Sequence, residues 1–451
     1  MQSPAIDLAN RSLLQTPPDA AAGNRRRQRR ILAIIWVAVL GAFVTMLAGL
    51  RARQNQLDFS HYYTSAMALR AGQDPYTTDL TPYAAKAGLD IAHINHADYP
   101  PTFVLCSELL TFFPAPIAYW IWIGVSLIAL GVTLRLLLSG LARDDAVMAW
   151  MLAALALMYP PIREHFQTAQ CQVLILLMIV LAARWMDEGN ERAAGMVLAF
   201  AALLRAFPVL LAGYLVVRRR WRTLGYMALG LAIGIGATIG LIGAHTSLGF
   251  VGRFKYLTED NWIYRPANVA LISFLSRLFL YCFKFPFSAQ IDLARRLVVS
   301  ASRLALLALT AWATRSHAGD RGQDRRALSL WIVAMILLSP TAWFHYFVLL
   351  LMPLIEVISA ARYGRASRRA AATAAASYVL TLAATILGSM LEGGLGSLAE
   401  GVLKETKFVS LAIAYLAAYW FVRDGLRLSA DELAREPYVP SRAALDSAIA
   451  S

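Results

Sequence analysis

The sequence predicts an all-α integral membrane protein with about twelve membrane-spanning helices. Hydrophobic residues make up 58% of the 451 residues and charged residues only 16%, whereas soluble domains carry about 25% charged residues. Apolar runs recur from Ile31 to Phe421, and each approaches the ~20 residues that a helix needs to cross a bilayer. Arginine clusters stand at the ends of these runs, where they indicate the cytoplasmic side.

The net charge of +14 does not by itself indicate a nucleic-acid partner. The arginines fall at the ends of apolar runs, where they also suit anionic lipid headgroups. Cys106, Cys171 and Cys282 are scattered in apolar sequence without metal or disulfide spacing, so we expect structural thiols. The first apolar run, 31–50, is too long for a cleaved signal peptide and predicts an uncleaved anchor.

The positive-inside rule orients the first part of the chain. "RRRQRR" at 25–30 predicts a cytoplasmic tail over 1–30, so the span 31–50 leads to an outside loop over 51–115. The apolar piece "TFVLCSELLTFF" in that loop is too short to cross and carries Glu108, which favours an interfacial or re-entrant helix. The next spans are expected at about 116–138, 146–158 and 171–186.

Two later segments predict helical hairpins. Residues 193–217 are apolar but cationic at both flanks, and "LLRAFP" with Arg205 interrupts their middle. Proline breaks a helix, and two short helices meeting there keep both basic flanks inside, with a tip in a protein-lined cavity. Residues 328–360 repeat this pattern, with Pro340 in the middle and His345 near the tip.

The remaining elements complete a membrane domain over 31–422 with a cytoplasmic tail over 423–451. In order, we expect a span at 223–243, a second outside excursion over 244–296 with a lateral helix at 266–283, a span at 297–314, and two last spans at 370–391 and 407–422 that bracket an outside loop.

This threading brings polar residues from five segments to the outer face of the membrane. They are Asp58, Tyr62, Glu164, His165, Gln170, Arg205, Asn268 and His345. Ionisable groups at membrane depth are expensive and usually mark a site, so the pattern predicts a cavity that opens outward. An amphipathic helix from Asp58, ended by Gly72 and Pro75, would place Asp58 at the mouth of that cavity.

Several motifs resemble those of glycosyltransferase family 87, the polyprenol-phosphate-dependent mannosyltransferase-like membrane enzymes. "DFSHYYTSAMALRAGQDPY" at 58–76 and "DYPPTFVL" at 98–105 resemble the N-terminal signature of the family. Residues 169–222 resemble its Gly-Gln, Ala-Gly and Lys-Pro run. "RPANVALISFL" resembles its Asn-containing outer segment, and "SPTAWFHYFVLLLMPL" its Ser-Pro-x-x-W-x-H-Y element.

The resemblance implies a GT-C-type bundle whose two long periplasmic loops carry short interfacial helices, with the active site on the outer side. It implies a polyprenyl-phosphate-linked sugar, typically mannose, as donor. The catalytic aspartate of the family matches Asp58, and its late histidine matches His345. The sequence departs from the family's motifs at two places, and both bear on the identity of the donor. Arg205 stands where a lysine is usual, and either Gln170 or Gln172 corresponds to the family's glutamine.

The expected chemistry needs a base for the acceptor hydroxyl and positive charge for the departing phosphate. Asp58 suits the first role. Arg205 suits the second because its fork matches phosphate oxygens, with Arg163 and His345 as further phosphate ligands. A single base predicts inversion. No metal is required, although divalent-metal dependence stays open. The expected substrate-binding residues are Tyr62, Tyr63, Glu164, His165, Gln170, Gln172 and Asn268.

Each of these residues also has a structural alternative. Asp58 could simply cap its helix, and Arg205 could reach the phosphate of an ordinary lipid. His345 could be an interfacial histidine without a ligand. Glu164 and His165 could form a local pair, and Asn268 could cap the lateral helix.

We therefore expect a monomeric inverting glycosyltransferase of the bacterial inner membrane that acts on the periplasmic side. It would move a sugar from a polyprenyl phosphate to a hydroxyl of a glycolipid or glycan, among membrane lipids and without nucleic acid. The alternative is a transporter or flippase of a lipid-linked or anionic substrate, although transporters usually place their site at the midplane. The clustered polar residues argue against a third option, a non-enzymatic scaffold.

Overall fold

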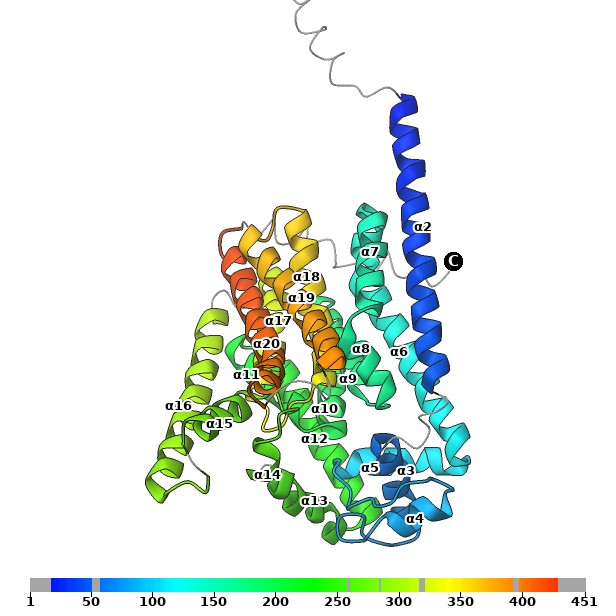
Figure 1. Ribbon diagram of the computed structural model, residues 1–451, viewed down its shortest axis with the longest axis vertical. Coiled ribbons are helices and arrows are strands. Elements are labelled where there is room, and N and C mark those ends of the chain that lie inside the picture. Colours follow the sequence, from blue (N-terminus) through cyan, green and yellow to red (C-terminus); the bar gives the residue numbers. More distant parts are fainter. Residues whose placement is uncertain are drawn as a thin grey trace, which may run out of the picture.

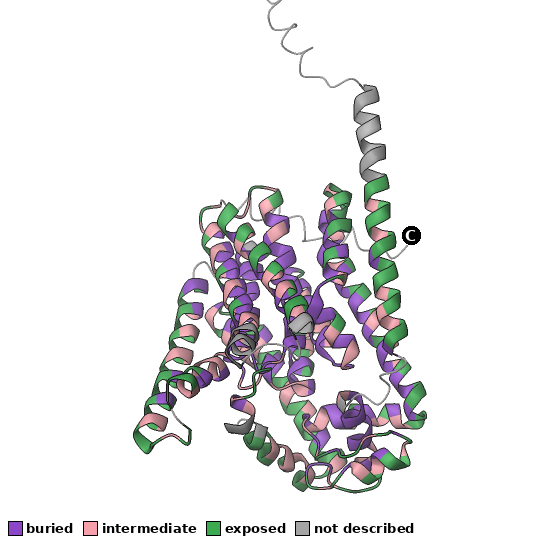
Figure 2. Cartoon of the chain, in the orientation of Figure 1, coloured by how far each residue is buried: buried purple, intermediate pink, exposed green. Residues whose placement is uncertain are grey.

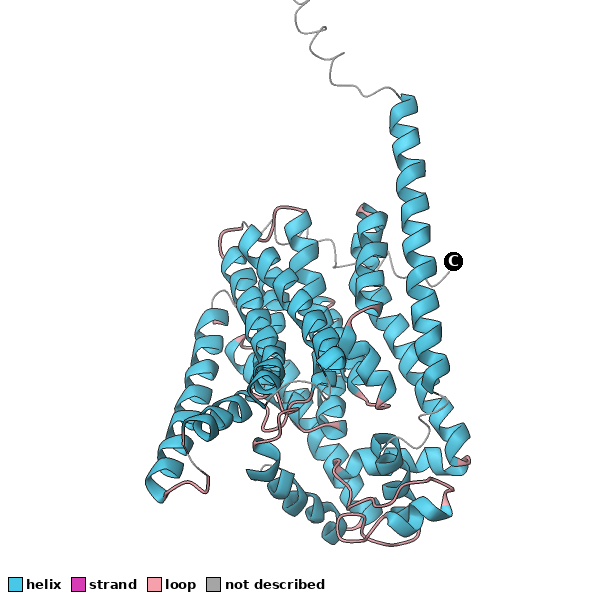
Figure 3. Ribbon diagram, viewed as in Figure 1, coloured by secondary structure: helices cyan, strands magenta, loops and turns pink. Residues whose placement is uncertain are grey.

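The computed structural model describes residues 18–50, 57–257, 260–283, 285–315, 321–391 and 397–428. Every regular element in these ranges is a helix, and Figure 3 shows helices joined by short loops. This confirms the all-α class. Buried side chains gather in the middle of the bundle, whereas the first long helix is exposed along much of its length (Figure 2).

Helix α2 (Pro18–Gly49) lies at the edge of the molecule (Figure 1). Its stretch from Arg30 to Gly49 has a mean hydropathy of 2.6, and only 6% of that window is buried. It contacts α7 (Ala146–Leu157), where Trp36 meets Trp150 edge to face. A helix this apolar and this exposed is stable only against lipid, as expected for the first span.

Four short helices gather at one end of the bundle, the lower end in Figure 1, which we call the α3 end. They are α3 (Leu57–Arg70), α4 (Thr81–Lys86), α5 (Pro101–Ser107) and the 3₁₀ helix η2 (Glu108–Phe112). Gly72, with φ of 74°, follows α3 as expected for a helix stop. The apolar piece "TFVLCSELLTFF" falls on α5 and η2, which together are too short to cross a bilayer.

Six helices in the described ranges are long and apolar enough to cross a membrane. They are Arg30–Gly49, α6 (Ala115–Asp144), α12 (Trp221–Ile242), α16 (Ala289–Thr314), Phe344–Arg362, and Arg368–Leu387 in α19 (Arg368–Leu391). A seventh results if α7 and α8 (Pro160–Gln167), which are bent by 47°, cross together. The membrane class is therefore confirmed, but the count of about twelve spans is not.

The first expected hairpin consists of α10 (Glu191–Leu204), η3 (Phe207–Leu210) and α11 (Leu211–Val217). Arg205, between α10 and η3, has an extended backbone that breaks the helix. Arg220, just beyond α11, donates to Glu191 at the start of α10 over 2.7 Å. The two ends of the segment therefore return to the same place, as predicted.

The second expected hairpin consists of α17 (Arg321–Leu338), η4 (Phe344–Leu350) and α18 (Leu351–Arg362). Glu356 of α18 accepts from Ser329 and lies 3.4 Å from Arg325, both on α17. η4 and α18 form the centre of the fold, because 89% of their most apolar window is buried. η4 also packs beside α9 (Gln172–Asp187).

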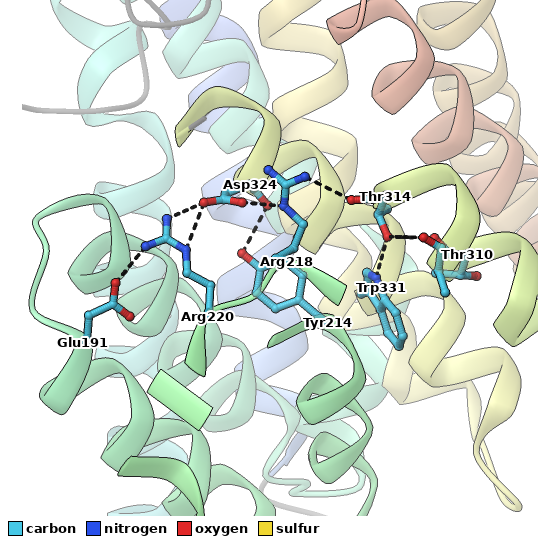
Figure 4. A network of polar contacts seen from close by, with 9 residues as sticks. Glu191, Tyr214, Arg218, Arg220, Thr310, Thr314, Asp324 and Trp331 are labelled. Carbon is cyan, nitrogen blue, oxygen red and sulfur yellow. Dashed lines mark hydrogen bonds and ion pairs between the residues drawn. The ribbon is translucent and has the colours of Figure 1, made fainter. Parts of the chain in front are cut away.

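A buried ionic network joins the two hairpins where α11 ends and α17 begins (Figure 4). Arg218 donates through Nε to Asp324 over 2.5 Å, and Arg220 contacts the same carboxylate. The side chains of Arg218 and Asp324 are only 1% and 3% exposed. We expected these arginines to be topology signals; the structure adds that they bind α11 to the start of α17.

The rest of the chain covers the hairpins. α13 (Ala244–Leu257), α14 (Asp260–Ile263) and α15 (Leu271–Cys282) follow α12, and α15 is too short to cross, as expected for the lateral helix. Arg277 of α15 pairs with Glu405 over 2.6 Å. Glu405 lies on α20 (Ser397–Gly425), so the expectation of an outside loop up to residue 406 was wrong from Ser397 onward. That segment is helical and holds the buried arginine.

Candidate active site

Asp58 lies in the first turn of α3 and is half-buried. Its Oδ1 accepts a hydrogen bond from the hydroxyl of Tyr99 over 3.3 Å. Burial, and then the charge of Asp58, raise the pKa of Tyr99 well above its ordinary value. The phenol therefore stays protonated and keeps donating to the carboxylate.

Arg205 lies over the face of the Tyr99 ring. Its guanidinium carbon stands 4.4 Å from the centre of the Tyr99 ring, a cation–π contact. Nη2 donates to Oε1 of Gln170 over 2.7 Å, and Nε donates to Sγ of Cys171 over 3.2 Å. The helix break at Arg205 makes this geometry available, since α10 ends one residue earlier.

Tyr62, one turn after Asp58 on α3, closes the arrangement. Its hydroxyl donates to the same Oε1 of Gln170 over 3.0 Å, and its ring meets Tyr99 edge to face at 4.7 Å. Burial raises the pKa of Tyr62 well above its ordinary value, so it also stays a donor. We call Asp58, Tyr62, Tyr99, Gln170 and Arg205 the outer polar cluster. Four of its five members were predicted site residues.

A second group lies at the break of the other hairpin. Nδ1 of His345, in η4, lies 3.7 Å from Oε1 of Glu164 on α8. The rings of Phe207 and Tyr346 are 4.7 Å apart. Phe207 lies two residues after Arg205, and Tyr346 directly follows His345. The two hairpin tips therefore meet, and their polar residues occupy neighbouring parts of one region.

Three predicted residues in this region bury polar atoms without partners. Within the described ranges, both ring nitrogens of His165, both amide atoms of Gln172 and Nε2 of His345 have no hydrogen-bond partner. Buried polar groups in folded proteins are almost always satisfied, and an unmade bond is costly. These atoms are therefore free to bond to a polar ligand.

The other three predicted residues have different surroundings. The hydroxyl of Tyr63 donates to the carbonyl of Phe113 over 2.8 Å, away from the outer polar cluster. Asn268 accepts hydrogen bonds from the backbone N–H groups of Ala342, over 3.0 Å, and of Ala270. Its amide nitrogen donates to the carbonyls of Trp262 and Pro340. Asn268 therefore holds the break of the second hairpin, where Pro340 and Ala342 lie. Arg163 is exposed on α8.

Sequence reasoning missed Tyr99 as a site residue, although its motif "DYPP" was noted. It also missed the charged residues beside Asp58. The buried His61 lies one turn along α3 and senses the charges of Asp58 and Asp98. Asp98 in turn accepts from Arg253 over 2.5 Å. The signal in the sequence that could have identified Tyr99 and Asp98 was an aspartate next to a Tyr-Pro-Pro turn.

No group of three or more His, Cys, Asp or Glu side chains in the described part of the chain is placed to hold a metal ion. Arg205 is the cation of the outer polar cluster. Within the described residues its Nη1 has no hydrogen-bond partner, so one face of the fork is open to an anion.

Comparison with known proteins places this site in a family context. Residues 98–340 match the family model described as Glycosyltransferase family 87. Over 354 residues the chain is 25% identical to a polyprenol-phosphate-mannose-dependent alpha-(1-2)-phosphatidylinositol mannoside mannosyltransferase of Mycolicibacterium smegmatis (strain ATCC 700084 / mc(2)155), an alignment that covers 72% of this chain and 75% of the relative. The range matched by the family contains Tyr99, Gln170 and Arg205, whereas Asp58 and His345 lie outside it.

Proposed function

Because the chain belongs to glycosyltransferase family 87, we propose that it transfers a sugar from a polyprenyl phosphate to a hydroxyl group of a glycolipid or glycan, at the periplasmic face of a bacterial inner membrane. That the protein is a membrane glycosyltransferase follows from the family and from its apolar helices. Mannose is the proposed sugar, since the mannosyltransferase relative is named for a polyprenol-phosphate-mannose donor. The family match favours this reading over a transporter.

One observation carries the mechanism: Tyr99 contacts both Asp58 and Arg205. A transferase of this kind needs a base on one side of the sugar and a cation on the other. The two charged groups are held apart by one aromatic ring, so they do not neutralise each other in a direct ion pair. Each remains available for one half of the reaction.

Asp58 acts as the general base in the proposed reaction. It takes the proton of the acceptor hydroxyl as that oxygen attacks the anomeric carbon of the sugar. The bond from the anomeric carbon to the phosphate oxygen breaks, and polyprenyl phosphate leaves with the bonding electrons. Attack opposite to the leaving group inverts the configuration.

Arg205 stabilises the leaving phosphate. Its Nη2 and Nε are fixed by Gln170 and Cys171, which orients the open Nη1 toward the ligand. A fixed guanidinium costs little reorganisation when charge develops on the phosphate. His345, His165 and Gln172 supply the orphaned polar atoms that would bind the sugar hydroxyls or the remaining phosphate oxygens.

The test uses full-length protein in nanodiscs with polyprenyl-phosphate-[¹⁴C]mannose and a membrane lipid extract. We expect wild type to move label into a new glycolipid, and Asp58→Asn to lower the rate by about 10²- to 10⁴-fold, the usual contribution of a general base. Asp90→Asn, which alters an exposed carboxylate of the same loop, is the matched control and should keep the wild-type rate. Transfer by Asp58→Asn at the wild-type rate would remove this mechanism, and a panel of other polyprenyl-linked sugars would test the choice of mannose.

A further inference from the structure

Arg303 lies in the interior of α16, a helix long and apolar enough to span the membrane. Its Nη2 donates to the backbone carbonyl of Leu338 over 2.7 Å. Its Nε is buried and has no hydrogen-bond partner. Among the described residues, no carboxylate lies within ion-pair distance of Arg303, and the mechanism proposed above does not use it.

The neighbouring arginines, unlike Arg303, have carboxylate partners. On the same helix, Arg295 and Arg296 both pair with Asp292 over 2.7 Å. On α15, the buried Arg277 pairs with Glu405. A cation within a membrane-spanning helix is expensive and usually has a partner. One neutral carbonyl satisfies only one of the five N–H groups of a guanidinium, so Arg303 lacks an anion.

The surroundings indicate where that anion comes from. Leu297, Leu304 and Leu307 on α16 are 62%, 66% and 38% exposed, so the helix presents an apolar surface on either side of Arg303. A free ion does not cross such a surface, whereas a lipid carries its phosphate along it. Leu338 ends α17 at the break of the second hairpin, which faces the α3 end, and a long arginine side chain can extend toward headgroup depth.

We propose that Arg303 binds the phosphate group of a membrane lipid where α16 meets the end of α17. The guanidinium fork matches two phosphate oxygens, and the bound phosphate would accept from N–H groups that the bond from Nη2 to Leu338 leaves over. Arg303 is not a member of the outer polar cluster, and the test of this lipid site requires no sugar transfer.

The experiment measures thermal unfolding of the full-length protein in neutral detergent, together with native mass spectrometry of bound lipid. Four additions are compared: phosphatidylglycerol, a polyprenyl monophosphate, diacylglycerol without phosphate, and inorganic phosphate. The variants are Arg303→Gln and the matched control Arg296→Gln, which removes an exposed arginine two turns away and leaves Arg295 paired with Asp292. A phosphate lipid in large excess should raise the unfolding midpoint of wild type and of the control by at least about 3 °C.

We expect Arg303→Gln to lose this lipid-dependent rise and the retained lipid. A response limited to phosphatidylglycerol or to the polyprenyl phosphate would identify the source of the phosphate. If Arg303 only caps α17, Arg303→Gln lowers the unfolding midpoint without lipid and keeps the full rise with lipid, which overturns the proposal. A rise in wild type with diacylglycerol or inorganic phosphate that equals the rise with a phosphate lipid also overturns it. Arg303→Lys serves if the glutamine variant does not fold: it should retain less lipid than wild type, and undiminished retention would contradict the proposed fork.

Discussion

The hydroxyl group of Tyr99 donates a hydrogen bond to the carboxylate of Asp58 over 3.3 Å. The face of the same ring supports the guanidinium of Arg205. One side chain therefore sets the distance between the proposed base and the proposed phosphate ligand. Hydroxyl and ring can be removed separately, which lets the two effects be measured separately.

Tyr99→Phe removes the hydroxyl and keeps the ring under Arg205. A hydrogen bond to a charged group contributes about 1.5–3 kcal/mol, so we expect kcat to fall about 10- to 100-fold with little change in KM for the donor. Tyr99→Leu also removes the ring and should raise KM for the donor. Steady-state kinetics in nanodiscs measure both, with Tyr83→Phe in the same loop as control. A rise in KM without loss of kcat in Tyr99→Phe would contradict this division of roles.

The two glutamines should respond differently to loss of their amide groups. Gln170 accepts from both the buried Tyr62 and the half-buried Arg205, so Gln170→Leu removes the acceptor of both donors and should destabilise the protein by about 1–3 kcal/mol for each buried donor left without a partner. Gln172 is buried without partners, so Gln172→Leu should not lower stability but should raise KM for the donor. Unfolding in detergent and donor titration measure the two quantities. If Gln172→Leu is unstable and its KM unchanged, its amide has a structural role.

The fold was predictable where local sequence carries a strong signal. Basic flanks on both sides of one apolar run, with a proline in its middle, predicted each hairpin, because charge and helix breaking are properties of a few adjacent residues. Pairing across the chain is different. Nothing near Arg218 indicates that Asp324, more than a hundred residues later, will pair with it. Nothing near Arg277 indicates its pairing with Glu405.

The site was predictable to a similar extent. Asp58, Gln170 and Arg205 lie at or beside element ends, with Tyr62 one turn into α3, and the threading brought those ends to one face. Tyr62 and Tyr63 could not be separated without the structure: consecutive helical residues point about 100° apart, so only one reaches Gln170 while the other turns to Phe113. Tyr99 was missed because a tyrosine in a Pro-rich turn shows its role only once Asp58 and Arg205 flank it.

The network around Asp324 should be a major contributor to stability. Asp324→Asn removes the carboxylate that both Arg218 and Arg220 contact, and breaking a buried pair in this way costs about 3–5 kcal/mol. Arg296→Gln is the matched control, because the Arg296–Asp292 pair has an arginine that is 68% exposed and should contribute about 1 kcal/mol or less. Chemical unfolding in detergent compares the two. Equal losses would show that the buried network does not hold the hairpins together.

His61 should make the stability of the α3 end depend on pH. Burial lowers the pKa of His61 below 6.5, against the opposing pull of Asp98 and Asp58, while Arg253 adds to the lowering. Because the folded pKa is the lower one, the stability associated with a neutral His61 is fully present above pH 6.5. It is lost as pH falls from 6.5 toward the lowered pKa, since the unfolded chain then binds a proton that the folded chain does not.

His61→Gln should remove this part of the pH dependence. The difference in unfolding midpoint between wild type and the variant, followed from pH 8 to pH 5, should be constant above about pH 6.5 and should shift in favour of the variant below it. Taking a difference cancels the carboxylates that titrate in both proteins. His245→Gln, whose ring is 89% exposed, is the control and should follow wild type throughout. A difference curve for His61→Gln that is flat down to pH 5 would mean that the imidazole charges in the folded protein as easily as in water, and that Asp58 and Asp98 compensate fully for its burial.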